Sequence, residues 1–209
     1  NSYHFIDRLS KKMRSDSVVV SDAGSVFYVV SQGIKLKENQ RYITSGGQAE
    51  MGYTLPACIG ISFAKGRQEV LGMTGDGSFQ LNIQELQTIK YYNLPIKIFV
   101  WNNDGYLAIR ATQSKFFEKR FIGTDQTCGI SFPSTEKIVK AYGLKYFRIS
   151  KSKELEKDLE EILNYPKAAI CEVMCLRDQE IVPSVSSFTK ENGMMVSKPL
   201  EDMYPFLDR

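Results

Sequence analysis

Two short turns, each directly after an apolar run, carry the residues best suited to bind a metal ion. They are GDGS at residues 75–78 and NNDG at residues 102–105. Magnesium prefers hard oxygen ligands, and the Asp76 carboxylate, the Asn103 amide oxygen and the Gly105 backbone carbonyl are all of that kind. A neutral amide beside one carboxylate suits a metal whose remaining charge is balanced by a diphosphate. A lone GDG tripeptide is more often a plain turn, so the pairing of the two turns is what indicates a site.

Backbone groups near these turns could hold the diphosphate itself. Gly77 and Ser78 open a predicted helix, so their N–H groups and the positive end of the helix dipole would face an anion. Gly24 and Ser25 begin another predicted helix in the same way. Residues 45–56 (SGGQAEMGYTLP) form a loop whose glycines let the backbone approach a ligand closely, although such a loop could also be a flexible connector.

Parallel strands must bring these segments together. If the strands that precede the two turns are neighbours, their carboxyl ends lie side by side, where open α/β sheets bind ligands. About six strands alternate with helices along the chain, which predicts an α/β fold with three layers (α/β/α) and a mostly parallel sheet. The predicted helices are 3–13, 25–32, from 56 onward, 79–89, 131–143 and 151–164, and the predicted strands are 17–24, 41–44, 69–74, 96–101, 145–149 and 168–176.

Two segments lack a regular period. Residues 106–133 are predicted to be a long connection, either a functional lid or a disordered loop. Arg110 in this connection could pair with a substrate carboxylate or be a solvated loop arginine. We expect a domain at residues 1–176 that binds the metal and the diphosphate, followed by an extended arm at residues 177–209, which is rich in prolines and polar residues.

Composition limits the possible partners. The chain has 27 basic and 24 acidic residues and a net charge of +3, which is no basic footprint for nucleic acid, so a small partner is expected. The longest apolar stretch, residues 55–64, is too short to span a membrane. The four cysteines form no C-x-x-C pair, which favours free thiols and a cytoplasmic location. Because the first residue is Asn1 rather than Met, we expect the chain to be a piece of something longer.

These motifs resemble a known family. GDGS at residues 75–78 followed by Asn102 and Asn103 is similar to the thiamine diphosphate-binding motif of thiamine-dependent enzymes. The loop at residues 45–56 is similar to the SGGLGTMGFGLP loop of the acetolactate synthase large subunit. The resemblance runs from about residue 15 to the end and covers only the carboxyl-terminal, diphosphate-binding third of those enzymes. It implies the thiamine diphosphate-binding fold, with thiamine diphosphate and Mg²⁺ as cofactors.

The resemblance also implies roles for single residues. The Met51 side chain would wedge the cofactor into a bent form, and the Ala49 carbonyl would accept a hydrogen bond from its amino group; Met51 could otherwise be an ordinary core residue. The bend would make proton removal intramolecular, which raises the effective concentration of the base. Glu50 is expected to be structural, because the family takes its catalytic glutamate from an amino-terminal domain. The implied ligands of the metal are Asp76, Asn103 and Gly105, and those of the cofactor are Gly24, Ser25, Ala49, Met51, Gly75, Gly77, Ser78 and Asn103.

The implied function is that of an acetolactate synthase-like transferase or lyase that decarboxylates or joins small 2-keto acids. No side chain in this chain is expected to be catalytic, so activity would need an amino-terminal pyrimidine-binding domain from the same or a second chain, in a homodimer or homotetramer. Residues 104–110 (DGYLAIR) do not match the synthase, which leaves the substrate open. The alternatives are a stand-alone subunit of a two-chain 2-keto acid decarboxylase and a non-catalytic Mg²⁺-dependent binding domain.

Overall fold

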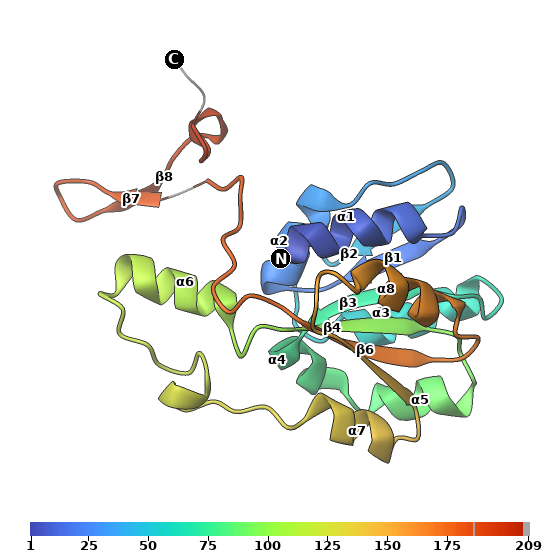
Figure 1. Ribbon diagram of the computed structural model, residues 1–209. Coiled ribbons are helices and arrows are strands. Elements are labelled where there is room, and N and C mark those ends of the chain that lie inside the picture. Colours follow the sequence, from blue (N-terminus) through green and yellow to red (C-terminus); the bar gives the residue numbers. More distant parts are fainter. Residues whose placement is uncertain (186, 207–209) are drawn as a thin grey trace. The chain divides into compact units, whose positions relative to one another are not determined.

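A parallel sheet forms the centre of the first part of the chain (Figure 1). The computed structural model describes residues 1–185 and 187–206. The strands of the sheet are β1 (Val18–Ser21), β2 (Arg41–Thr44), β3 (Leu71–Gly75), β4 (Lys97–Asn102), β5 (Lys145–Ile149) and β6 (Ala169–Met174). Their order is β2-β1-β3-β4-β6-β5, and each neighbouring pair is parallel. The expected six strands are therefore present, and the sheet is fully rather than mostly parallel.

Burial explains why these segments become strands. The central strands β1, β3, β4 and β6 are almost entirely buried, because helices cover both of their faces. Their sequences are accordingly continuous apolar runs. The edge strands β2 and β5 are partly exposed and carry more polar residues.

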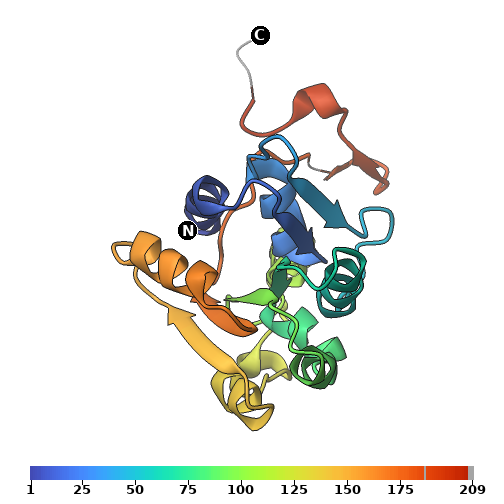
Figure 2. The same cartoon turned by 90° about the vertical axis from the view of Figure 1, so that its right-hand side faces the viewer.

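Helices cover both faces of the sheet (Figures 1 and 2). The layer with α1, α2 and α8 includes the edge-to-face contact of Phe5 with Phe99, whose ring centroids are 5.3 Å apart. In the other layer Cys58 of α3, Leu86 of α5 and Val139 of α7 belong to one buried apolar cluster. This arrangement confirms the expected three-layer α/β/α fold. The bounds are α1 (Ser2–Lys12), α2 (Gly24–Gly33), α3 (Thr54–Ala64), α4 (Asp76–Phe79), α5 (Glu85–Tyr91), α6 (Leu107–Phe116), α7 (Thr135–Ala141) and α8 (Leu155–Asn164).

Two sequence-based predictions of secondary structure were wrong. The helix expected at residues 79–89 is divided into α4, a 3₁₀ turn at Gln80–Asn82, and α5. Residues 106–133 were expected to contain no regular element, but they contain α6 and a 3₁₀ turn at Gln126–Cys128. The buried residues of α6 are Leu107 and Arg110, so this helix lacks the apolar stripe by which helices are recognised.

The chain divides into two units, residues 1–179 and residues from 180 on. In the second unit β7 (Ser187–Thr189) and β8 (Met195–Ser197) form an antiparallel hairpin, followed by a 3₁₀ turn at Leu200–Asp202. The expected arm at residues 177–209 thus contains a hairpin, while Ser186 and residues 207–209 of that arm lie outside the described residues. Within the described part of the chain, none of the helices has the length and apolar character needed to cross a membrane.

Candidate functional site

A cleft lies at the carboxyl ends of β1, β3 and β4, and the residues predicted from the two turns and the loop gather there. Segments that are distant in sequence meet in this cleft because the strands before them are neighbours in the sheet. Leu107, Ala108 and Ile109 of α6 add an apolar wall. The predicted residues that line the cleft are Gly24, Ser25, Ala49, Met51, Gly75, Asp76, Gly77, Ser78, Asn103 and Gly105.

The topology of the sheet explains why the cleft opens at this place. Strand β1 pairs with β2 on one side and with β3 on the other, so the order of strands reverses here. Helix α2, which follows β1, packs in the layer of α1, whereas Phe79 of α4, which follows β3, belongs to the cluster on the opposite face. Such a reversal leaves a crevice beyond the strand ends, and open α/β sheets bind ligands there.

Asp76 joins the two predicted metal-binding turns. Its carboxylate accepts hydrogen bonds from the N–H of Gly77 at 2.8 Å and from the N–H of Gly105 at 3.0 Å. The side chains of Asp76 and Asn103 are both buried. Burial raises the pKa of Asp76, while the backbone N–H groups of Gly105, Gly77 and Asn103 act in the opposite direction. The structure thus brings the carboxylate of the first turn directly against the backbone of the second.

The donor set at these turns suits a cation that also binds an anionic ligand. The residues described here contain no group of three or more His, Cys, Asp or Glu side chains arranged to hold a metal ion. One carboxylate, one amide and one carbonyl leave about half of an octahedral shell to other ligands, which is typical of Mg²⁺ held together with phosphate and water.

The turn at residues 102–105 has an unusual backbone that its neighbours hold in place. Asp104 and Gly105 both have positive φ angles, 58° and 121°. A Cβ atom on Gly105 would lie 2.0 Å from the Thr124 carbonyl oxygen, so a side chain has no room here. The Asn102 side chain accepts from the N–H of Asp104 at 3.1 Å and donates to Glu172 at 2.9 Å. Strand β6, through Glu172, therefore helps to fix this turn.

Asp22 is a site residue that the sequence analysis missed. It is fully buried at the end of β1 and accepts hydrogen bonds from the hydroxyls of Thr74 at 2.8 Å and Ser78 at 2.7 Å. Burial raises its pKa, and the hydrogen bond from Ser78 is the strongest opposing influence. Ser78 in turn accepts from the N–H of Gly52 at 2.7 Å. Asp22 thereby links β1 and α4 to the loop that carries Met51. The sequence signal for this residue was a carboxylate directly after a buried strand.

The loop at residues 45–56 presents Met51 and Ala49 to the cleft. Met51 is 36% exposed, so it is not an ordinary core residue. Ala49 has a positive φ of 54°, and its N–H donates to the Ser45 carbonyl at 2.7 Å. Glu50 is exposed, and its N–H donates to the Ser45 hydroxyl at 3.1 Å, which agrees with a structural role for this residue.

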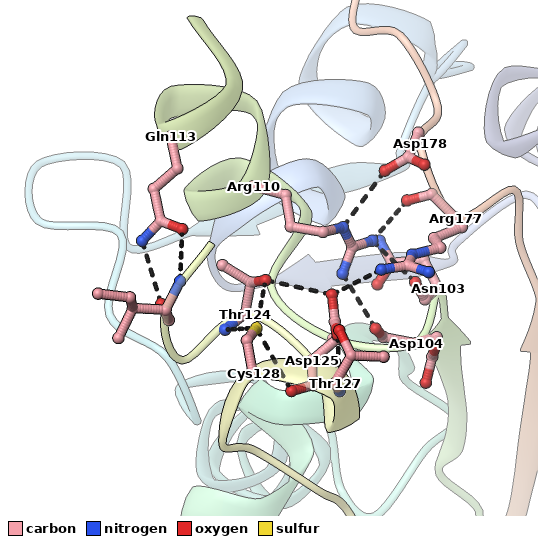
Figure 3. A network of polar contacts seen from close by, with 12 residues as sticks. Asn103, Asp104, Arg110, Gln113, Thr124, Asp125, Thr127, Cys128, Arg177 and Asp178 are labelled. Carbon is pink, nitrogen blue, oxygen red and sulfur yellow. Dashed lines mark hydrogen bonds and ion pairs between the residues drawn. The ribbon is translucent and has the colours of Figure 1, made fainter. Parts of the chain in front are cut away.

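Arg110 is buried, so the prediction that it could be a solvated loop arginine was wrong. Its guanidinium points at the turn that carries Asn103 and Asp104 (Figure 3). This contact could not be predicted from residue types, because the acceptors on the turn are backbone carbonyl oxygens.

Comparisons with known proteins show which family this chain resembles. A protein family described as "Thiamine pyrophosphate enzyme, C-terminal TPP binding domain" matches residues 22–173. The chain is 32% identical over 187 residues to an acetolactate synthase large subunit of Porphyra purpurea, a match that covers 90% of this chain and 31% of the relative. It is 29% identical over 190 residues to the large subunit of Lactococcus lactis subsp. lactis (strain IL1403), covering 91% and 32%.

A mitochondrial acetolactate synthase of Schizosaccharomyces pombe is 34% identical over 143 residues, covering 68% of this chain and 21% of the relative. The chain thus spans about a third or less of the length of these curated relatives. The region matched by the family includes β3 and β4 together with the segments that follow β1, β3 and β4.

Proposed function

Because the chain belongs to the thiamine pyrophosphate enzymes and corresponds to their C-terminal TPP-binding domain, we propose that the cleft beyond β1, β3 and β4 holds thiamine diphosphate through Mg²⁺. The observation that carries the proposal is the 3.0 Å hydrogen bond from the Gly105 N–H to the Asp76 carboxylate. This contact puts both turns within reach of one small cation.

The protein ligands of the ion are the Asp76 carboxylate, the Asn103 amide oxygen and the Gly105 carbonyl. Hard oxygen ligands of low total charge match Mg²⁺ when two oxygens of a diphosphate complete the charge balance. The burial that raises the pKa of Asp76 supports this assignment, because a nearby cation would compensate the cost of keeping that carboxylate ionised.

The diphosphate lies against Gly24, Ser25, Gly75, Gly77 and Ser78 in this proposal. Helix α2 begins at Gly24, so its first N–H groups and the positive end of its dipole face the cleft. The hydrogen bond from Ser78 to Asp22 holds the start of α4 in position beside it.

The organic part of the cofactor packs against Met51 and the Ala49 carbonyl. When bound, thiamine diphosphate supplies a nucleophilic thiazolium carbon and an electron sink for the decarboxylation of 2-keto acids. Met51 would support the bound cofactor, the Ala49 carbonyl would accept a hydrogen bond from its amino group, and the apolar wall at Leu107 and Ile109 would limit access of water.

For the whole protein we propose an acetolactate synthase-like transferase or lyase acting on small 2-keto acids. The names of the relatives support this reaction class. We also propose that a pyrimidine-binding domain is supplied by the same or a second chain. The protein would assemble as a homodimer or homotetramer. The four cysteines lie within the described residues and are free of disulfides. Free thiols support a reducing compartment such as the cytoplasm.

Calorimetric titration of thiamine diphosphate tests the cofactor assignment. We expect binding with Mg²⁺ and its loss with EDTA. Asp76→Asn removes the single carboxylate and should weaken binding at least about tenfold, since even an outer-shell partner of a metal is worth that much. Asp104→Asn is the matched control, because it makes the same chemical change at an exposed neighbour where Asn tolerates a positive φ. Full affinity in Asp76→Asn would refute the assigned ligand.

A turnover assay tests the proposed need for a partner domain. We expect the chain alone to release no carbon dioxide from pyruvate even when it is saturated with thiamine diphosphate and Mg²⁺. Sustained release by the chain alone would show that its own residues suffice for catalysis.

A further inference from the structure

Arg110 occupies an unusual position for a charged residue. It lies on α6, its side chain is 4% exposed, and its guanidinium points back at the turn that precedes the helix (Figure 3). Three of its hydrogen bonds go to backbone carbonyl oxygens, those of Asn103 at 2.9 Å, Asp104 at 2.9 Å and Arg177 at 2.6 Å. A contact of 3.3 Å to the Asp178 carboxylate completes the set.

These partners indicate that the hydrogen bonds of the guanidinium mainly hold backbone. Among the described residues, the carboxylate that accepts a hydrogen bond from Arg110 is that of Asp178, whose side chain is 73% exposed, and such a pair contributes little. The planar guanidinium can bind several acceptors at once, which a lysine ammonium does not do with the same geometry. Two of its acceptors are the carbonyls of Asn103 and Asp104, which belong to consecutive peptide units of the turn.

We propose that Arg110 is a positioning residue for the metal-binding turn. By holding the carbonyls of Asn103 and Asp104, it directs the Asn103 amide oxygen and the Gly105 carbonyl toward the ion. This inference rests on the proposed function, because it assigns a purpose to Arg110 only if the turn binds a metal.

The backbone of the turn shows why such a residue is needed. Asp104 and Gly105 have positive φ angles in succession, a conformation that persists when surrounding contacts impose it. A Cβ atom on Gly105 would lie 2.9 Å from Nη1 of Arg110, so the guanidinium packs directly against this strained segment. Loss of the guanidinium would leave the carbonyls of Asn103 and Asp104 without these donors and free the turn to relax.

The residue that binds the guanidinium opposite the turn is itself held by further hydrogen bonds. Arg177, whose carbonyl binds Arg110, also donates from its own guanidinium to Asp125 at 2.6 Å (Figure 3). Asp125 is buried and accepts from the N–H and hydroxyl of Thr127. The neighbouring Thr124 carbonyl accepts from the N–H of Tyr106, directly after the turn, at 2.8 Å. Arg110 therefore joins the turn to a network that is itself fixed.

The test compares Arg110→Gln, Arg110→Lys and Arg120→Gln in the full-length protein. Mn²⁺ serves as the probe, titrated in the presence of thiamine diphosphate and followed by its electron paramagnetic resonance signal. We expect Arg110→Gln to weaken Mn²⁺ binding about 10- to 100-fold, the range typical of outer-shell partners, and to change the shape of the signal. Arg110→Lys should recover part of the affinity. Arg120→Gln removes an exposed arginine from the same region and should match the wild type.

Two readouts separate positioning from a general structural role. A purely structural arginine would lower the thermal stability of the metal-free protein but leave Mn²⁺ affinity and the signal of the folded fraction unchanged, and that result would overturn the proposal. If Arg110→Gln does not fold, Arg110→Lys decides: wild-type Mn²⁺ affinity and signal would overturn the proposal, and weaker binding would support it. A wild-type protein that binds neither cofactor would instead refute the proposed function on which the inference rests.

Discussion

Ala49 adopts a left-handed backbone conformation, with a φ of 54°, in the loop that presents Met51 to the cleft. This conformation costs a non-glycine residue about 1–2 kcal/mol. Strained backbone persists where the surrounding structure imposes it, and it is frequent at ligand sites. The hydrogen bond from the Ala49 N–H to the Ser45 carbonyl imposes the turn here.

Replacing Ala49 with glycine should relieve this strain. We expect Ala49→Gly to raise the free energy of unfolding by about 1 kcal/mol, measured by urea denaturation. The control is Ala57→Gly, which places the same substitution inside helix α3 and should lower the free energy of unfolding by about 1 kcal/mol. A loss of stability in Ala49→Gly as large as that in the control would contradict the assigned strain.

Some residues of the candidate site could be predicted from the sequence and others could not. Asp76 and Asn103 were predictable because each stands in a polar turn directly after an apolar strand, and both line the cleft. Asp22 was not predicted as part of the site, and Arg110 was predicted only as a possible partner of a substrate carboxylate or a solvated residue. The contacts that these side chains make, with hydroxyls of β3 and α4 for Asp22 and with backbone carbonyls for Arg110, could not be predicted from the local sequence.

The turn between β4 and α6 leaves no room for a side chain at Gly105. The φ of 121° at Gly105 is unfavourable for other residues, and the Thr124 carbonyl occupies the space of a side chain. The turn therefore depends on glycine for both its conformation and its fit.

Gly105→Ala should be strongly destabilising and should also weaken metal binding. Backbone strain and overpacking together predict a loss of about 2–4 kcal/mol in the free energy of unfolding. Gly60→Ala is the matched control, since Gly60 lies inside α3 with nothing within 4 Å of an added Cβ, and it should gain about 1 kcal/mol. Equal stability of the two variants would show that the turn is less constrained than its geometry indicates.

Helices α1 and α2 are connected through Asp7. It accepts a hydrogen bond from Lys11 of α1 at 2.9 Å and another from Lys35, just beyond α2, at 2.6 Å. Lys11 first and then Lys35 hold the pKa of Asp7 below its usual value of 3.8. For a lowered carboxylate pKa, the stabilisation is complete above the usual value and is lost as the pH falls through the lowered one.

The variant Asp7→Asn tests this connection. We expect it to be less stable than the wild type near pH 7, and the difference in free energy of unfolding should shrink as the pH falls below about 3.8. Urea denaturation at a series of pH values measures both quantities. A difference that stays constant down to strongly acid pH would show that the charge of Asp7 contributes nothing.

Elements were predictable where their pattern follows from burial. The strands were recognised because burial on both faces requires continuous apolar runs. Helix α6 was missed because it buries Arg110 with only Leu107. The predicted helix at residues 79–89 is interrupted by a 3₁₀ turn at Gln80–Asn82, although Phe79 before the turn and Leu86 after it belong to the same buried cluster.

At the scale of the whole molecule, the three-layer fold could be predicted from the alternation of strands and helices, because parallel strands require crossover connections that cover both faces. The hairpin of the second unit could not, since its short strands β7 and β8 are partly or fully exposed and lack a strong apolar pattern. The cofactor could be predicted from the sequence, because both of the turns that indicate it lie within this chain.

Removal of the metal should affect the stability of the folded unit. A ligand present at 100 times its dissociation constant stabilises the folded state by about 2.7 kcal/mol. We therefore expect thiamine diphosphate with Mg²⁺ to raise the melting temperature measured by calorimetry, and EDTA to return it to the value without cofactor. Asp76→Asn should respond less than the wild type to both additions; a melting temperature that rises equally in this variant would argue against Asp76 as the metal ligand.

The most direct measurement is a crystal structure of the chain grown with thiamine diphosphate and Mn²⁺, because manganese can be located from its anomalous scattering. The account predicts one anomalous peak between the Asp76 carboxylate, the Asn103 amide oxygen and the Gly105 carbonyl, with the diphosphate as a further ligand. A cofactor bound elsewhere, or a metal that does not contact both turns, would contradict it.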